Sequence, residues 1–407
     1  MDGQPNQRAT DRTLLRAGPE ISAAHADALD EFERFIHRDP ARRGLCASEL
    51  DESGQSTLLR LGAGQLAAAA NELAQNAKRV AIVTGFFIPR AQPPCAETDG
   101  PPGSLFLAHC LRELGIDTAI VTDDPCAPAV RAAAKEIGFP RDRVFIAPLD
   151  AESWCSEFLQ SEFARELTHL VSIERVGPSH TPESILKSGG VKSGELLVVS
   201  GEQDTTAPNS LLATNNSPLL TFLADVAAEH HNRCHNMRGV CIDAHTAPLH
   251  LLFEQLPQFH PTARTIGIGD GGNEIGMGAI PWAELRHRLA GEQAGRVPCR
   301  IPCDFNIVAG TSNWGAMALA AGACLLRDRL DVLRPWTQER HRALLEQLVA
   351  NGPAVDGVTG RREATVDGLP FLTYIQPWEG ILRRVTSPIA SRDQSSLSAK
   401  CKIRSAK

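Results

Sequence analysis

The sequence predicts an α/β protein with an open, mostly parallel sheet covered by helices on both faces, the three-layer arrangement of Rossmann-like proteins. Two observations support this fold class. Short β-branched runs alternate regularly with helical segments from residue 79 onward. The runs are continuously apolar rather than alternating, which is typical of parallel strands that are buried on both faces.

The elements follow one another in a repeating order. The run RVAIVTG at 79–85 is the first strong strand, and the next two helical segments each end at a glycine, which is a common stop signal. We expect strands at 79–85, 117–123, 143–149, 169–177, 262–269 and 303–310. We expect helices at 104–115, 127–138, 152–168, 217–230, 247–257, from 274 onward, at 314–327 and at 333–350, with further helix within 21–78.

Local composition predicts one domain with two tails. Residues 21–385 form a single α/β domain, and the polar stretches 1–20 and 386–407 are typical of flexible tails, the second of them basic. The stretch 178–232 interrupts the strand–helix rhythm with many Ser, Gly, Thr and Asn residues, so we expect an insertion there.

The bulk composition argues against several classes of protein. A formal net charge of −7 gives no general attraction to nucleic acid or to an anionic membrane. No run approaches the roughly 18 apolar residues of a membrane-spanning helix, and the N-terminus lacks the apolar core of a secretory signal. We therefore expect a cytoplasmic protein. Because arginines occur near the N-terminus, the mitochondrial matrix is an alternative location. A homo-oligomer is also an open alternative. Eleven cysteines without a CxxC pair indicate reduced thiols rather than disulfides or zinc ligands.

Candidate site residues follow the first strand, where ligands bind in open α/β sheets. Thr84 ends that strand, and the loop 86–102 is much longer than the usual connection of about 2–6 residues. It carries Glu97 and Asp99, with the backbone N–H groups of Gly103 and Ser104 nearby to hold a substrate carboxylate. Asp99 can alternatively act only as a helix cap.

Two further segments carry charged residues without a clear structural need for them. Glu174 follows the apolar run that opens the strand at 169–177, and the irregular segment HNMRGVCID at 235–243 contains Asn236 and Arg238. An arginine can hold a carboxylate through two parallel hydrogen bonds, although a loop salt bridge is the simpler alternative.

The segment GIGDGGNEIGMG at 267–278 satisfies the G-x-G-x-x-G dinucleotide pattern after a predicted strand. Asp270 and Glu274, which flank Asn273, would repel a pyrophosphate, so we expect this acidic turn to bind an ammonium group or a divalent cation instead. A metal site would be formed by Asp99, Asp270 and Glu274. Oxygen ligands favour Mg²⁺, Mn²⁺ or Ca²⁺ over zinc, with Mg²⁺ or Mn²⁺ as the candidate cofactor.

Polar residues also follow the strand at 303–310. Ser312 and Asn313 stand at the start of a helix, where they either cap it or help to bind a carboxylate. Asp356 and Asp367, further along the chain, fit turns.

The motifs occur together in a known family. VTGFFIP and ETDGPPG within 83–103, IERVGP at 173–178, NMRG at 236–239, IGIGDGGNEIGMG at 266–278, SNWGA at 312–316 and VDGV at 355–358 stand in one order. Over roughly residues 40–375 the chain resembles the C-terminal domain of the D-glutamate cyclase family. The resemblance implies a hydro-lyase that converts D-glutamate to 5-oxo-D-proline and water. The family includes a mitochondrial enzyme in animals, and its longer members carry an additional N-terminal domain.

Lactam formation predicts roles for the acidic residues. A base must free the α-amine and an acid must help an oxygen leave, so we assign Glu97 or Asp99 to the amine and Glu174 or Glu274 to proton delivery. A protein that senses an acidic amino acid without transforming it is the main alternative. A nucleotide-dependent enzyme is the third.

Overall fold

The computed structural model describes residues 21–40, 61–188 and 218–386, together with residues 42, 45–46, 49–50 and 56–57. The predicted tails at 1–20 and 386–407, apart from Thr386, lie outside the described residues, as do residues 189–217 of the predicted insertion.

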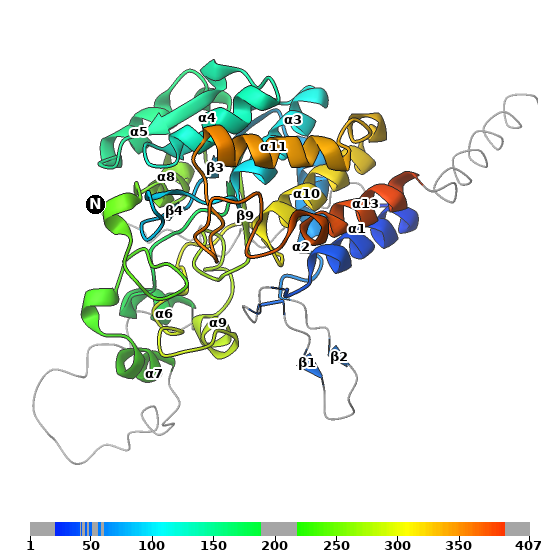
Figure 1. Ribbon diagram of the computed structural model, residues 1–407. Helices are drawn as coiled ribbons and strands as arrows, with labels where there is room; N and C mark the ends of the chain where they lie inside the picture. Colours follow the sequence, from blue (N-terminus) through cyan, green and yellow to red (C-terminus); the bar gives the residue numbers. More distant parts are fainter. Residues whose placement is uncertain are drawn as a thin grey trace, which may run out of the picture.

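A six-stranded sheet forms the centre of the fold (Figure 1). Its strands are β3 Arg79–Thr84, β6 Asp117–Asp123, β7 Val144–Ala147, β8 His169–Ile173, β9 Arg264–Gly269 and β10 Phe305–Val308. They lie in the order β10-β9-β8-β3-β6-β7, and every neighbouring pair is parallel. This is the doubly wound order, in which the chain starts in the middle and builds outward in both directions.

The apolar runs form the strands that the sequence predicts. Ile82 of β3 pairs with Ile120 of β6 on one side and with Val171 of β8 on the other, and all three side chains are fully buried. Helices cover both faces of the sheet, so most strand positions are buried. The predicted fold class is confirmed.

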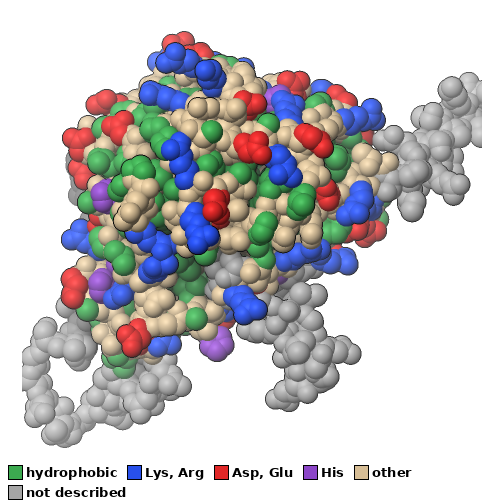
Figure 2. All heavy atoms as spheres, in the orientation of Figure 1, with side chains coloured by type: hydrophobic (Ala, Val, Ile, Leu, Met, Phe, Trp, Pro, Cys, Tyr) green, Lys and Arg blue, Asp and Glu red, His purple; other side chains and the backbone are tan. Residues whose placement is uncertain are grey.

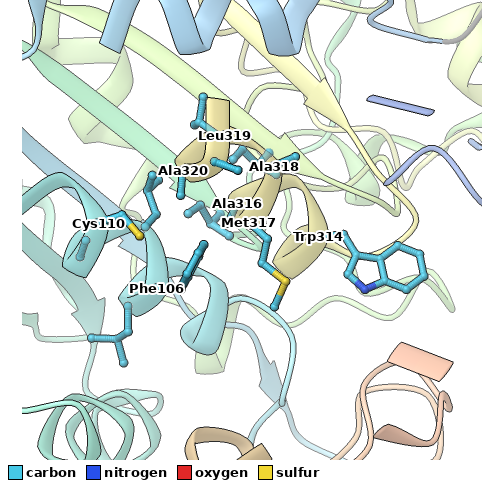
Figure 3. Packing of buried hydrophobic residues seen from close by; sticks show 14 of the residues in the cluster. Phe106, Cys110, Trp314, Ala316, Met317, Ala318, Leu319 and Ala320 are labelled. Carbon is cyan, nitrogen blue, oxygen red and sulfur yellow. The ribbon is translucent and has the colours of Figure 1, made fainter. Parts of the chain in front are cut away.

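On one face of the sheet, α10 Ser312–Leu326 lies at the centre of the helical layer. Every residue from Ser312 to Leu325 is buried, so the helix is apolar all round and rich in small residues. Figure 3 shows its alanines packed against α3, close to Phe106 and Cys110. A Cβ at Gly322 would lie 2.8 Å from the Cβ of Ala70, so α10 and α2 can approach this closely only with glycine there.

The other helices complete the two layers. The same face carries α1 Ala23–Ile36, α2 Gln65–Asn76, α3 Pro101–Glu113, α4 Ala127–Glu136, α11 Gln338–Asn351, α12 Phe371–Tyr374 and α13 Gln376–Thr386. On the opposite face, α5 Glu152–Gln160 and α8 His250–Phe259 pack their apolar sides on the sheet. Short 3₁₀ turns occur at Arg141–Arg143, Ala164–Glu166, Ala228–His230, Asp243–His245 and Leu330–Val332.

A smaller group of helices lies below the sheet in Figure 1. It consists of α6 Pro182–Ser188, α7 Pro218–Asp225 and α9 Trp282–Arg288. Their contact is a separate apolar cluster of Ile185, Phe222, Val226 and Trp282. Part of the predicted insertion at 178–232 thus has a small core of its own.

Three expectations about local structure were wrong. The loop 86–102 contains a hairpin of β4 Phe87–Ile88 and β5 Cys95–Ala96. Within the predicted helical stretch 21–78, β1 Glu49–Leu50 and β2 Ser56–Thr57 form an antiparallel pair. No helix starts at 274, because the Glu274 carboxylate accepts backbone N–H groups of the preceding turn; the next helix begins at Trp282.

None of the helices in the described ranges combines the length and apolar character needed to span a bilayer. Acidic and basic side chains are interspersed over the face shown in Figure 2.

Candidate active site

The predicted site residues cluster at the carboxyl ends of β3, β8 and β9. β3 and β8 are neighbours in the sheet, and the strand order reverses between them. Ligands in doubly wound folds bind in the crevice at such a reversal. Thr84 ends β3, Glu174 follows β8, and Asp270 follows β9, so the topology alone brings these three together.

A cavity of about 150 Å³ opens at this point. A cavity of this order has room for a molecule of several heavy atoms. Five predicted site residues line it, namely Glu97, Glu174, Asn236, Arg238 and Asn273. The remaining wall is made by Phe86, Ile88, Pro89, Arg90, Met237, Gly357 and Val358.

Glu97 enters the cavity from the end of the β4–β5 hairpin. Its backbone N–H donates to the Phe86 carbonyl at 2.9 Å, and its carboxylate contacts Gly357 closely. A Cβ at Gly357 would collide with Oε2 of Glu97, so the glycine of the VDGV motif makes room for this carboxylate.

Glu174 reaches the cavity from a different segment, immediately after β8. Its φ of +48° lies in the left-handed region, which is uncommon for a residue with a side chain and often marks a functional site. The hydroxyl of Ser312 donates to its Oε2 at 2.5 Å. A Cβ at Gly100 would lie 2.7 Å from the Glu174 Cβ and 2.9 Å from Oγ1 of Thr84, so only glycine allows these three segments to meet.

Two arginines stand at the mouth of the cavity. Arg90 donates to the carbonyls of Gly357 and Val358 at 2.9 Å each. Partial burial of the guanidinium, and next the charge of Arg238, lower the pKa of Arg90. Asn236 shapes the other side of the mouth, because its Oδ1 accepts the Arg238 N–H at 3.0 Å. Among the described residues, neither arginine forms an ion pair.

Asp99 and Asn313 lie beside the cavity and cap two helices. The Asp99 carboxylate accepts the N–H groups of Ser312 and Asn313 at the start of α10, at 2.8 and 2.9 Å. In return, Oδ1 of Asn313 accepts the N–H groups of Gly100 and Gly103 at the start of α3, at 3.1 and 2.7 Å.

These caps change the interpretation of the helix starts. The backbone N–H groups at the starts of α3 and α10, which we expected to hold a substrate carboxylate, donate to acceptors within the protein. The N–H group of Ser104 donates to the Gly100 carbonyl. At its own helix the Asp99 side chain accepts only the N–H group of the N-cap residue Gly100, at 3.1 Å, and the N-cap of α10 is Thr311 rather than Ser312. Gly103, Ser104, Ser312 and Asn313 thus shape the site from behind.

The acidic glycine turn is closed by its own glutamate. Glu274 accepts the N–H groups of Asp270, Gly271 and Gly272 at 3.2, 2.7 and 2.8 Å. These are the groups that would hold a pyrophosphate in a dinucleotide site, so this turn is unsuited to the nucleotide alternative. Asn273 donates to the His235 carbonyl and fixes the segment that carries Arg238.

Buried carboxylates behind the cavity form two groups that meet at Asp270. Oxygens of Asp99, Asp270 and Asp367 lie within 4.8 Å of one another, and so do those of Glu174, Asp270 and Glu274. Like charges this close in the interior require a cation or bound protons. Either group offers only oxygen ligands, which suits a hard divalent cation.

The sequence did not identify several charged residues that lie close to the site. Arg175 directly follows Glu174 and forms a buried pair with Asp123, at the end of β6. A charged residue at the end of an apolar strand was the signal used for Glu174, and the same signal applies to both. Asp367 was interpreted as a turn, and its φ of +54° agrees with a turn. All ten described cysteines are free, as predicted, and Cys95 packs in a small apolar cluster beside the cavity.

Comparison with known proteins identifies the family. The family model described as "D-glutamate cyclase-like, C-terminal" matches residues 35–184 and 199–377. The chain belongs to this family. It is also 26% identical over 374 residues to the human protein named "D-glutamate cyclase, mitochondrial". The match covers 86% of this chain and 50% of the human protein, so the chain spans about half the length of that relative.

Proposed function

We propose that this member of the D-glutamate cyclase-like family converts D-glutamate to 5-oxo-D-proline and water. The observation that carries the proposal is the pairing of two carboxylates, Glu97 and Glu174, with two guanidinium groups, Arg90 and Arg238, around one small cavity. The name of the human relative supports the choice of substrate.

The charges of the cavity complement those of the substrate. D-glutamate carries two carboxylates and one ammonium group. The guanidinium groups at the mouth attract the carboxylates, and an arginine can hold one through a planar fork. The acidic side chains suit the ammonium, while Phe86, Ile88 and Val358 offer apolar surface to the methylene carbons.

The reaction needs two proton movements. The amine nitrogen attacks the γ-carboxyl carbon, a C–N bond forms, a C–O bond breaks, and the released oxygen leaves as water with two protons from the nitrogen. Glu97 takes the protons that the nitrogen gives up, Glu174 delivers protons to the leaving oxygen, and exchange with solvent water returns both carboxyl groups to their starting states. Holding the two ends of the substrate together supplies much of the rate enhancement.

The hydrogen bonds narrow the choice of catalytic residues. Asp99 and Glu274 were the alternatives to Glu97 and Glu174. Both accept several backbone N–H groups, and neither is among the described residues that line the cavity. Their oxygens are occupied by backbone N–H groups outside the cavity lining, so we assign Asp99 and Glu274 to supporting the site.

A divalent cation would be held by Asp270 together with Asp99 and Asp367, or with Glu174 and Glu274. Mg²⁺ or Mn²⁺ fits such oxygen ligands. Its charge would offset the repulsion among these carboxylates. Asp270 belongs to both groups, and it is therefore the side chain through which we propose to test the cation.

The direct test combines a binding screen with a product assay. The pure protein is screened by thermal shift with D-glutamate, L-glutamate, NAD and NADP, and 5-oxoproline is then measured after incubation with each amino acid, with and without Mn²⁺. We expect a shift and product with D-glutamate. Binding without product would favour the alternative of an amino-acid sensor, and a shift with NAD or NADP alone would favour the nucleotide-dependent enzyme.

A further inference from the structure

A buried ion pair lies directly behind the cavity. Nη2 of Arg175 is 2.7 Å from Oδ2 of Asp123, and the two side chains are 1% and 0% exposed. Removing two charges from water is costly, and a buried pair is weak evidence for added stability. The role of this pair is therefore inferred from the backbone segments that it connects and not from the free energy that it contributes.

The pair connects the ends of three neighbouring strands. Arg175, just after β8, donates through Nη1 to the Gly85 carbonyl just after β3, at 2.9 Å, and through Nη2 to the Ala247 carbonyl at 2.7 Å. Asp123, which ends β6, accepts the N–H groups of Ala247 at 3.1 Å and of Cys126 at 3.3 Å. A single arginine fork thus joins three strand ends and the segment after the Asp243–His245 turn.

Both strand ends held by Arg175 lead straight into the cavity wall. Gly85 precedes Phe86, and Arg175 follows Glu174; Phe86 and Glu174 both line the cavity. The φ of +48° at Glu174 costs free energy and persists only where surrounding contacts impose it. On the C-terminal side of Glu174, the Arg175 side chain supplies such contacts.

We propose that Arg175, through Asp123, is a positioning residue that keeps the Glu174 backbone left-handed and its carboxylate in the cavity. Its predicted effect on turnover rests on the proposed function. Its effect on the Glu174 conformation does not. Lysine keeps the charge at this position but cannot reach the Asp123 carboxylate and two carbonyls with a planar fork.

The test compares Arg175→Lys with Arg79→Lys. Arg79 and Asp117 pair at 3.1 Å and begin β3 and β6, so this control joins two of those three strands at their opposite ends. We expect both variants to lower the melting temperature. Only Arg175→Lys should lower kcat, by up to about 10²-fold, with KM little changed, because a small misplacement of a catalytic group acts on the transition state.

A crystal structure of the Arg175→Lys variant gives the readout that needs no activity. We expect the Glu174 φ to leave the left-handed region or its carboxylate to leave the cavity. A variant with Glu174 in place and wild-type kcat overturns the proposal, as does an equal fall in kcat for Arg79→Lys. If the wild type does not turn over D-glutamate, the proposed function fails while the Glu174 conformation still decides this inference. Should Arg175→Lys not fold, Asp123→Asn, which keeps an acceptor oxygen, is measured in the same way.

Discussion

Asp99 and Asn313 cap each other's helices across the candidate active site. Asp99 precedes α3 but binds the N–H groups that start α10, and Asn313 belongs to α10 but binds those that start α3. Each side chain thus satisfies groups that its own helix could not. The exchange connects the N-termini of α3 and α10, next to Ser312, whose hydroxyl binds Glu174.

This exchange predicts a large effect of Asp99 on stability. Asp99→Ala leaves the buried N–H groups of Ser312 and Asn313 without their acceptor, while the Gly100 N–H keeps Oδ1 of Asn313, so the free energy of unfolding should fall by about 2–4 kcal/mol. Asp99→Asn keeps one acceptor oxygen and should lose less. Urea denaturation measures both, and an Asp99→Ala variant as stable as the wild type would contradict the structural role.

Glu174→Gln should lower kcat much more than it lowers stability. The amide keeps an acceptor for the Ser312 hydroxyl but cannot deliver a proton as the carboxylic acid does, so we expect a loss of about 10²–10⁴ in kcat. Glu292→Gln, at an exposed position, is the matched control. Steady-state kinetics with D-glutamate measure the effect, and unchanged kcat would remove Glu174 from the mechanism.

Arg238→Lys and Arg90→Lys should each weaken substrate binding. Lysine cannot reproduce the planar fork that matches a carboxylate. Both arginines are exposed at the cavity mouth rather than buried, so each loss should be at most about 2 kcal/mol, the low end for breaking a buried pair. Calorimetric titration with D-glutamate measures it, with Arg131→Lys as an exposed control. If both variants bind like the wild type, the substrate carboxylates are held elsewhere.

The buried histidine of α11 predicts how stability depends on pH. His341 is packed among Phe106, Trp336 and Trp378, and burial, followed by the charge of Arg340, lowers its pKa to about 3. The unfolded chain, with an ordinary histidine pKa near 6.5, binds this proton more readily. The contribution to unfolding free energy is therefore complete above about pH 6.5 and is lost as the pH falls toward 3.

Unfolding at two pH values isolates this effect. Between about pH 7 and pH 5 the wild type should lose roughly 2 kcal/mol through His341, and His341→Leu should not show that part of the loss. His287→Gln, at an exposed position, should leave the pH dependence unchanged. Equal pH dependence in the wild type and His341→Leu would show that this histidine does not titrate as described.

A bound cation should depend on Asp270, the member shared by both carboxylate groups. We expect protein purified without chelators to contain close to one Mn²⁺ or Mg²⁺ per chain and Asp270→Asn to contain much less. Metal analysis by mass spectrometry decides this, with Asp150→Asn, at an exposed position, as the control. If the wild-type protein contains no stoichiometric ion, the cation proposal is wrong, and bound protons must neutralise these carboxylates.

The sequence was most informative where one element's own residues decide its structure. The apolar run 117–123 predicted β6 to the residue, because a strand buried on both faces needs no partner-specific information. The same reasoning could not predict that no helix starts at 274. There a local side chain, Glu274, takes the backbone N–H groups of its own turn.

The composition of the site was only partly predictable, for a physical reason. Glu97, Glu174 and Arg238 stand in separate segments, and their common position at strand ends was sufficient to propose them together. Arg90 follows β4 in a hairpin that the sequence did not predict. Whether Arg90 lies close to Arg238 depends on how that hairpin folds back. The exchanged caps of Asp99 and Asn313 likewise depend on tertiary packing, which no local pattern records.

The central claim is that Glu97 acts on a substrate bound in the cavity, and the Glu97→Gln variant tests it most directly. Binding of D-glutamate is measured by calorimetry and formation of 5-oxo-D-proline by chromatography, for wild type and variant side by side. We predict that the wild type forms the product from D-glutamate and that Glu97→Gln still binds the substrate but forms product at least about 10²-fold more slowly. No product from the wild type, or wild-type turnover by the variant, would contradict the account.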